Sequence, residues 1–103
     1  MYNNKFSSLF PDKIKCKCIK DYLFNKTDRF KGITFTKSHY YRFSRPDIRH
    51  KDSKLVAVVK DETQEWVGMD IDRFNKHFVV ILDSSDIENK KICEEYKINF
   101  IIE

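Results

Sequence analysis

The stretch FTKSHYYRFSRPDIRHKDSKLVAVV, residues 35–59, contains two strand-like segments separated by a polar segment. Its first part is rich in β-branched and aromatic residues, which favour strands, and Lys37-Ser38 marks a turn or bulge inside it. Its last part is a purely apolar run. Between the two lie residues 44–54, where Pro46 cannot donate a hydrogen bond to a sheet. The stretch therefore predicts strand, long loop and strand, and with them a β-rich domain.

A second strand signal lies upstream, in KIKCKCIK at residues 13–20. Ile14, Cys16 and Cys18 alternate with lysines, and a two-residue period with one apolar face is typical of a half-buried strand. The lysines on the other face are expected to guard a sheet edge. Residues 21–32 have no sustained period and are predicted to form a loop.

Downstream, residues 55–60 and 66–69 flank the turn-like sequence DETQE, which predicts a β-hairpin. MDIDRFNKHF then begins with acidic residues and ends with basic ones, as the helix dipole prefers, so it predicts one or two helical turns. Residues 78–82 are expected to form a strand. A capping box of Ser85 and Glu88 predicts a helix after it, followed by a last short strand at INFII.

The size of the chain fits one domain, with 103 residues of which 41% are hydrophobic and 15% aromatic. No signal peptide is visible, and the longest apolar runs have five residues, against the ~20 that a membrane helix needs. A cytoplasmic protein that does not insert in a membrane is expected. Its three cysteines are expected to be free thiols.

The charge is unevenly distributed along the chain. Residues 1–60 contain fifteen Lys or Arg and five Asp, a net charge of +10, whereas residues 61–103 carry a net charge of −6. Two arrangements are open. The fold can present a dipolar surface that steers a charged partner, or the two halves can interleave and neutralise each other locally.

The order of these segments resembles that of small bacterial and phage proteins with an SH3-like β-barrel. The similar segments are KCKCIKD at residues 15–21, FTKSHYYRF at 35–43, VVKDETQEW at 58–66 and DRFNKHFVVI at 72–81. Ser38 and His39 stand where the family usually has Gly-Lys. The resemblance implies a barrel but little about function, because such barrels carry unrelated activities.

The fold class expected is mainly β (α+β), a small five-stranded SH3-like barrel with an appended C-terminal helix and short strand. Residues 1–12 would form an N-terminal arm, residues 13–82 the barrel, and residues 83–103 a helix-strand extension of the same domain. The core is expected to include Val58, Trp66, Phe74, Phe78 and Ile81.

No residue set in the sequence predicts an enzyme. Cys16, Cys18 and Cys93 with three histidines lack the two close pairs of a structural zinc site, and they are interpreted as buried small hydrophobes. No local signature joins a cysteine to a base, and two glycines cannot make a phosphate-binding loop. We therefore expect no catalytic residues, no metal and no cofactor.

Two kinds of binding function remain. The first is a non-enzymatic protein-binding module, in a specific form a phage or mobile-element inhibitor of a host defence enzyme that handles nucleic acid. A loop as long as residues 44–54 is commonly functional. The residues expected to bind the partner are Arg42, Arg45, Ile48, Arg49, His50, Lys51 and Lys54. A second candidate surface consists of the acidic residues Asp83, Asp86, Glu88, Glu94 and Glu95.

The alternative is a nucleic-acid-binding β-barrel that uses the basic stretch of residues 29–54. Basic side chains there alternate with the aromatic residues Tyr40, Tyr41 and Phe43. Cations neutralise phosphates, and exposed aromatic rings stack on bases. Strand alternation places Tyr40 and Tyr41 on opposite faces, so at least one of them is expected in the core.

Overall fold

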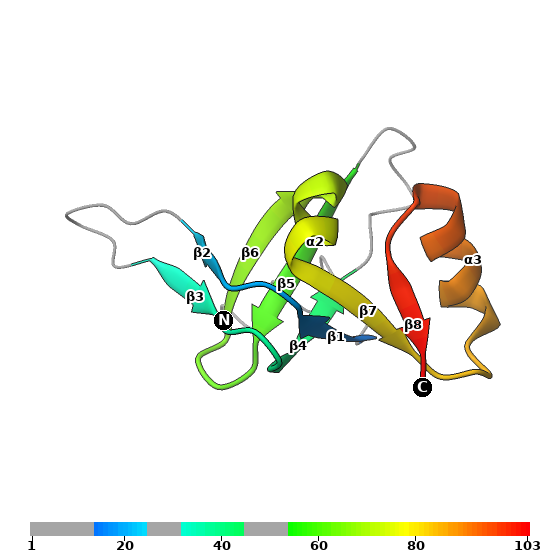
Figure 1. Ribbon diagram of the computed structural model, residues 1–103, viewed down its shortest axis with the longest axis horizontal. Coiled ribbons are helices and arrows are strands. Elements are labelled where there is room, and N and C mark those ends of the chain that lie inside the picture. The colour runs from blue at the N-terminus through cyan, green and yellow to red at the C-terminus, as the bar shows by residue number, and fades with distance from the viewer. Residues whose placement is uncertain (1–13, 25–31, 45–53) are drawn as a thin grey trace.

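The computed structural model describes residues 14–24, 32–44 and 54–103, which form eight strands and two helices (Figure 1). In chain order these are β1 (Ile14–Cys18), β2 (Tyr22–Phe24), β3 (Ile33–Phe35), β4 (Tyr40–Ser44), β5 (Leu55–Lys60), β6 (Glu65–Asp70), α2 (Ile71–His77), β7 (Phe78–Leu82), α3 (Ile87–Tyr96) and β8 (Phe100–Ile102). The expected α+β class with mostly β structure is confirmed.

Six strands form one sheet in the order β6-β5-β4-β1-β7-β8, and β2 pairs with β3 separately. All neighbours are antiparallel except β7 and β8, which are parallel. The expected closed five-stranded barrel is not confirmed, because β6 and β8 end the sheet without pairing to each other in the described residues. The expectation that the lysines of β1 guard an edge is wrong, since β1 lies between β4 and β7.

The pair β2–β3 continues the pair β1–β4 beyond a bend. The amide of Cys18 donates to the carbonyl of His39 (2.9 Å), and the amide of Ser38 donates to the carbonyl of Cys18 (2.7 Å). Ser38 has φ 76°, in the left-handed region that suits a turn. The predicted turn at Lys37-Ser38 is thus confirmed. The expected loop is wrong for Tyr22–Phe24, which forms β2, and Figure 1 shows the β2–β3 ribbon extending away from the large sheet.

The core lies on one face of the sheet. Val58, Phe74 and Phe78 are fully buried there, as predicted. Ile81 is also buried, but it pairs with Lys15 and so lies on the opposite face. Trp66 is only half-buried. The alternation of residues along the strands sorts the two faces as expected, with Cys16 and Cys18 completely buried on the core face.

An aspartate side chain caps the N-terminus of each of the two described helices. Asp70 accepts a hydrogen bond from the amide of Arg73 (2.8 Å), and Asp86 accepts one from the amide of Asn89 (3.1 Å). The predicted capping box is therefore wrong, because Asp86 is the N-cap of α3 and Ser85 precedes it. Neither helix in the described ranges is long and apolar enough to cross a membrane.

We predict that Phe78→Ala lowers the free energy of unfolding by roughly 3–5 kcal/mol, because the ring is fully buried among other rings. Urea denaturation followed by circular dichroism measures this. Leu55→Ala is the control, since Leu55 is 62% exposed and its truncation should cost less than about 1 kcal/mol. Equal denaturation midpoints for the two variants would contradict the assignment of Phe78 to the core.

Candidate functional site

The face of the sheet opposite the core carries one row of side chains across all six strands. In register, this row consists of Trp66, Val59, Arg42, Lys15, Ile81 and Ile101. Ala57 and Val59 are buried although they lie on this face. The part of the face that is open and charged is therefore on β1 and β4.

We name this open part the Tyr40 face, consisting of Lys15, Lys17, Tyr40 and Arg42. Lys15 lies opposite Arg42, and Lys17 opposite Tyr40, in the antiparallel register. The ring of Tyr40 is 50% exposed, and the Nζ atoms of Lys15 and Lys17 lie 5.0 and 5.8 Å from its centroid. Arg42 Nε forms an ion pair with Asp61 Oδ1. The positive charge of the face therefore comes mainly from the two lysines.

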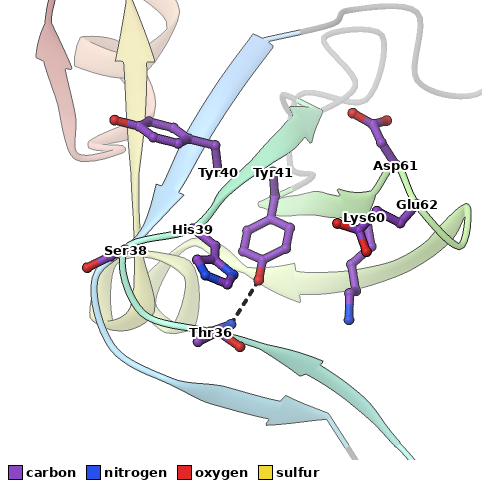
Figure 2. A pocket seen from close by; sticks show the side chains of 8 residues that line it. All are labelled: Thr36, Ser38, His39, Tyr40, Tyr41, Lys60, Asp61 and Glu62. Carbon is purple, nitrogen blue, oxygen red and sulfur yellow. Dashed lines mark hydrogen bonds between the residues drawn. The ribbon is translucent and has the colours of Figure 1, made fainter.

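Tyr41 points to the other side of β4 from Tyr40, as strand alternation predicts (Figure 2). Its ring packs edge-on against Phe35, with centroids 4.9 Å apart. Its hydroxyl oxygen accepts a hydrogen bond from the amide of Thr36 (2.9 Å). Tyr41 is thereby tied both to the core and to the bend between β3 and β4.

A pocket of about 440 Å³ opens where β4 and β5 separate. The ladder between these strands ends at Arg42 and Val59, so the next pair is not formed. Figure 2 shows the lining of this His39 pocket, which consists of Thr36, Ser38, His39, Tyr40, Tyr41, Lys60, Asp61 and Glu62. A smaller hollow of about 280 Å³ borders it and shares Tyr40, Tyr41 and Asp61. The His39 pocket and the Tyr40 face are therefore adjacent.

The structure separates the basic residues that were expected to act together. Arg42 belongs to the Tyr40 face, whereas Lys54 lines a different pocket of about 320 Å³ beside Asp70, Glu95 and Lys97. The other expected binding residues, Arg45, Ile48, Arg49, His50 and Lys51, lie outside the described residues. Sequence reasoning missed Lys15 and Lys17 as part of a site. The one signal was their regular alternation with Ile14, Cys16 and Cys18.

Of the five acidic residues expected to form a second surface, two stabilise local structure and three are exposed on α3. Asp83 Oδ1 accepts a hydrogen bond from the amide of Ser85 (3.1 Å). This bond, together with hydrogen bonding to the Ser85 side chain, holds the pKa of Asp83 below its ordinary value. Asp86 caps α3. The exposed acids of the helix, Glu88, Glu94 and Glu95, share it with the exposed residues Lys90 and Lys91. The helix therefore presents charges of both signs.

The three cysteines are free and buried. Burial raises the pKa of the Cys93 thiol to about 11, and it also raises the pKa values of Cys16 and Cys18. All three thiols therefore stay protonated at neutral pH, which disfavours them as nucleophiles. Within residues 14–24, 32–44 and 54–103, no three His, Cys, Asp or Glu side chains gather as a metal site would require.

Comparison with protein families, with curated proteins and with solved structures finds no match. The resemblance to SH3-like barrel proteins stays a prediction.

We predict that the native thiols do not react with Ellman's reagent at pH 8 within the time in which the urea-unfolded chain reacts fully.

We also predict that the free energy of unfolding falls as the pH rises from about 9 to 11. Over this range the unfolded Cys93 loses its proton while the folded one keeps it, since its folded pKa is about 11 against an ordinary 9.0. Cys93→Ala should show a shallower fall than the wild type. Rapid labelling of the folded protein would contradict the burial of the thiols.

Proposed function

We propose that this protein is a non-enzymatic binding module and that its ligand is single-stranded nucleic acid, held on the Tyr40 face. The observation that carries the proposal is the half-exposed ring of Tyr40 with two lysine ammonium groups within 6 Å of its centroid. Proteins that bind single strands combine exposed aromatic rings, on which bases stack, with cations that follow the phosphates. The Tyr40 face supplies both kinds of group on one strand pair.

The interaction energies allow a base to replace the lysine ammonium groups on the ring of Tyr40. The two exposed cation–π contacts contribute about 1–2 kcal/mol together and stacking of one base contributes about 1–3 kcal/mol, and the displaced ammonium groups gain contacts with phosphates instead. A base can therefore displace the ammonium groups of Lys15 and Lys17 from the ring. Their long, flexible side chains then reach the phosphates on either side of that base.

A single strand suits this face better than a duplex. A ring standing on a sheet can stack only with a base that has left its own stack, and such bases occur in single strands, loops and ends. The net charge of +4, with +10 in residues 1–60, favours the approach of a polyanion. The Debye length is about 8 Å at physiological salt, so Lys15 and Lys17 act mainly on phosphates close to them.

Protein binding draws less support from the described residues. It was expected from residues 44–54, most of which lie outside the described part, and from the acidic segment, where lysines separate the acids. A closed barrel of the SH3-like type is not needed for the proposal, because an open strand pair presents the ring and the lysines equally well. Protonated thiols also favour a binding role over catalysis.

Fluorescence anisotropy with labelled ten-residue oligothymidylate and oligouridylate tests the proposal. We expect Tyr40→Ala to weaken binding by about 5- to 150-fold, which corresponds to the loss of one stacked base. The double variant Lys15→Ala/Lys17→Ala should reduce the slope of log affinity against log salt by about 1.4, or about 0.7 for each phosphate that the variant no longer neutralises.

Two control proteins make this result specific. Tyr40→Phe keeps the ring and should bind nearly as well as the wild type. Lys90→Ala/Lys91→Ala removes the same charge from α3, outside the Tyr40 face, and should change the slope much less. If the intact protein binds neither oligonucleotide, or if the α3 variant loses as much affinity as the β1 variant, the proposal is overturned.

A further inference from the structure

The His39 pocket and the smaller hollow beside Lys15 and Arg42 share the lining residues Tyr40, Tyr41 and Asp61. A chain whose base stacks on Tyr40 can therefore reach this pocket with a neighbouring base by passing around β4. Its volume of about 440 Å³ is in the range of small-molecule sites, roughly 300–1,000 Å³. The proposed function uses the ring and the lysines but leaves this pocket without a role.

Hydrogen-bond donors lie on one side of the pocket. The hydroxyl oxygen of Tyr41 accepts from the amide of Thr36, so its own proton is free to point into the pocket. His39 is exposed and lies beside Tyr41 in Figure 2, where its imidazole adds a ring N–H. Lys60 lies on the other side of Tyr41, and its Nζ donates to the carbonyl oxygen of Thr34 (2.9 Å).

An acceptor lies on the other side. Glu62 is exposed, and Figure 2 places it on the side of Tyr41 opposite to His39. Its neighbour Asp61 is engaged by Arg42, so Glu62 is the carboxylate that remains for a ligand. An ionised carboxylate only accepts hydrogen bonds and carries a negative charge, and it therefore repels phosphate and favours groups with several N–H donors.

We propose that the His39 pocket takes the base next to the one stacked on Tyr40 and that it prefers guanine. This inference rests on the proposed function. The Watson–Crick edge of guanine presents two neighbouring donors, N1–H and the N2 amino group, which match the two oxygens of one carboxylate. Its O6 is an acceptor on the same edge and suits the Tyr41 hydroxyl or the His39 N–H. Adenine, cytosine and uracil each direct a lone pair toward the carboxylate beside a single donor group.

The test compares labelled oligouridylate with the same oligomer in which one central residue is guanosine, adenosine or cytidine, again by fluorescence anisotropy. We expect the guanosine oligomer to bind about 5- to 150-fold more tightly, as expected for one bidentate contact to a base. Deoxyribose counterparts are measured in parallel. Because the proposed contacts are to the base, the preference must appear in whichever backbone the Tyr40 face binds.

Glu62→Gln supplies the decisive variant. It replaces one acceptor oxygen by a donor and should remove the guanine preference while the affinity for oligouridylate stays the same or rises slightly. Glu94→Gln makes the same chemical change on α3, away from the pocket lining, and should leave the preference intact. Both positions are exposed, so neither change should disturb folding.

The two proposals fail in different ways. If oligouridylate binds in a Tyr40-dependent manner but the four oligomers bind equally, the guanine pocket is overturned and the proposed function stands. A guanine preference that survives in Glu62→Gln overturns the role of Glu62 and with it this assignment of the pocket. If no oligomer binds, both proposals fall.

Discussion

The ring of Phe78 packs among the aromatic rings of Phe35, Phe74, Tyr22 and Tyr41, and the rest of the fold is arranged around this packing. Its centroid lies 5.4 Å from that of Phe35, 5.5 Å from that of Phe74 and 6.3 Å from those of Tyr22 and Tyr41. These rings come from β2, β3, β4 and α2, while Phe78 itself ends α2 and begins β7. One buried side chain therefore fixes the helix, the bent ribbon and the centre of the sheet relative to one another. Truncation of this ring would loosen all of these elements together.

This constraint also positions the candidate site. Tyr41 is turned inward by its packing on Phe35 and Phe78, and successive residues of a strand point to opposite faces, so Tyr40 must turn outward. The hydrogen bond from the Thr36 amide to the Tyr41 hydroxyl holds the bend at the start of β4. The ring of Tyr41 thus lines the space where β4 has left β5, and the pocket and the exposed ring are two consequences of one anchored residue.

Local patterns predicted much of the secondary structure, because strand alternation, hairpin spacing and helix-end charges involve residues close in the chain. They found β1, the hairpin β5–β6, α2 and the turn at Ser38. They could not find the order of strands, which placed β1 inside an open sheet and β8 parallel to β7. The same limit hid the candidate site. Lys17 meets Tyr40 only through the register of two strands that are far apart in sequence.

At the start of α3, Ser85 and Asp86 are both residue types that cap helices well. Asp83 accepts a hydrogen bond from the Ser85 amide, and this favours Asp86 as the cap.

The uneven charge along the chain is reduced but not removed by folding. Arg42 of the basic half pairs with Asp61 of the acidic half, whereas Lys15 and Lys17 keep a positive charge on the same face. Glu62 follows Asp61 in the chain and lines the His39 pocket. The phosphates of the proposed ligand would be attracted toward β1 and repelled from the pocket, while a base with N–H donors would meet no such penalty there. For the proposed nucleic-acid ligand, these charges favour an orientation with its backbone over the lysines and a base edge toward Glu62. In the proposed complex, electrostatics would orient the nucleic-acid backbone, and stacking on the Tyr40 ring would supply the affinity that exposed charges alone do not.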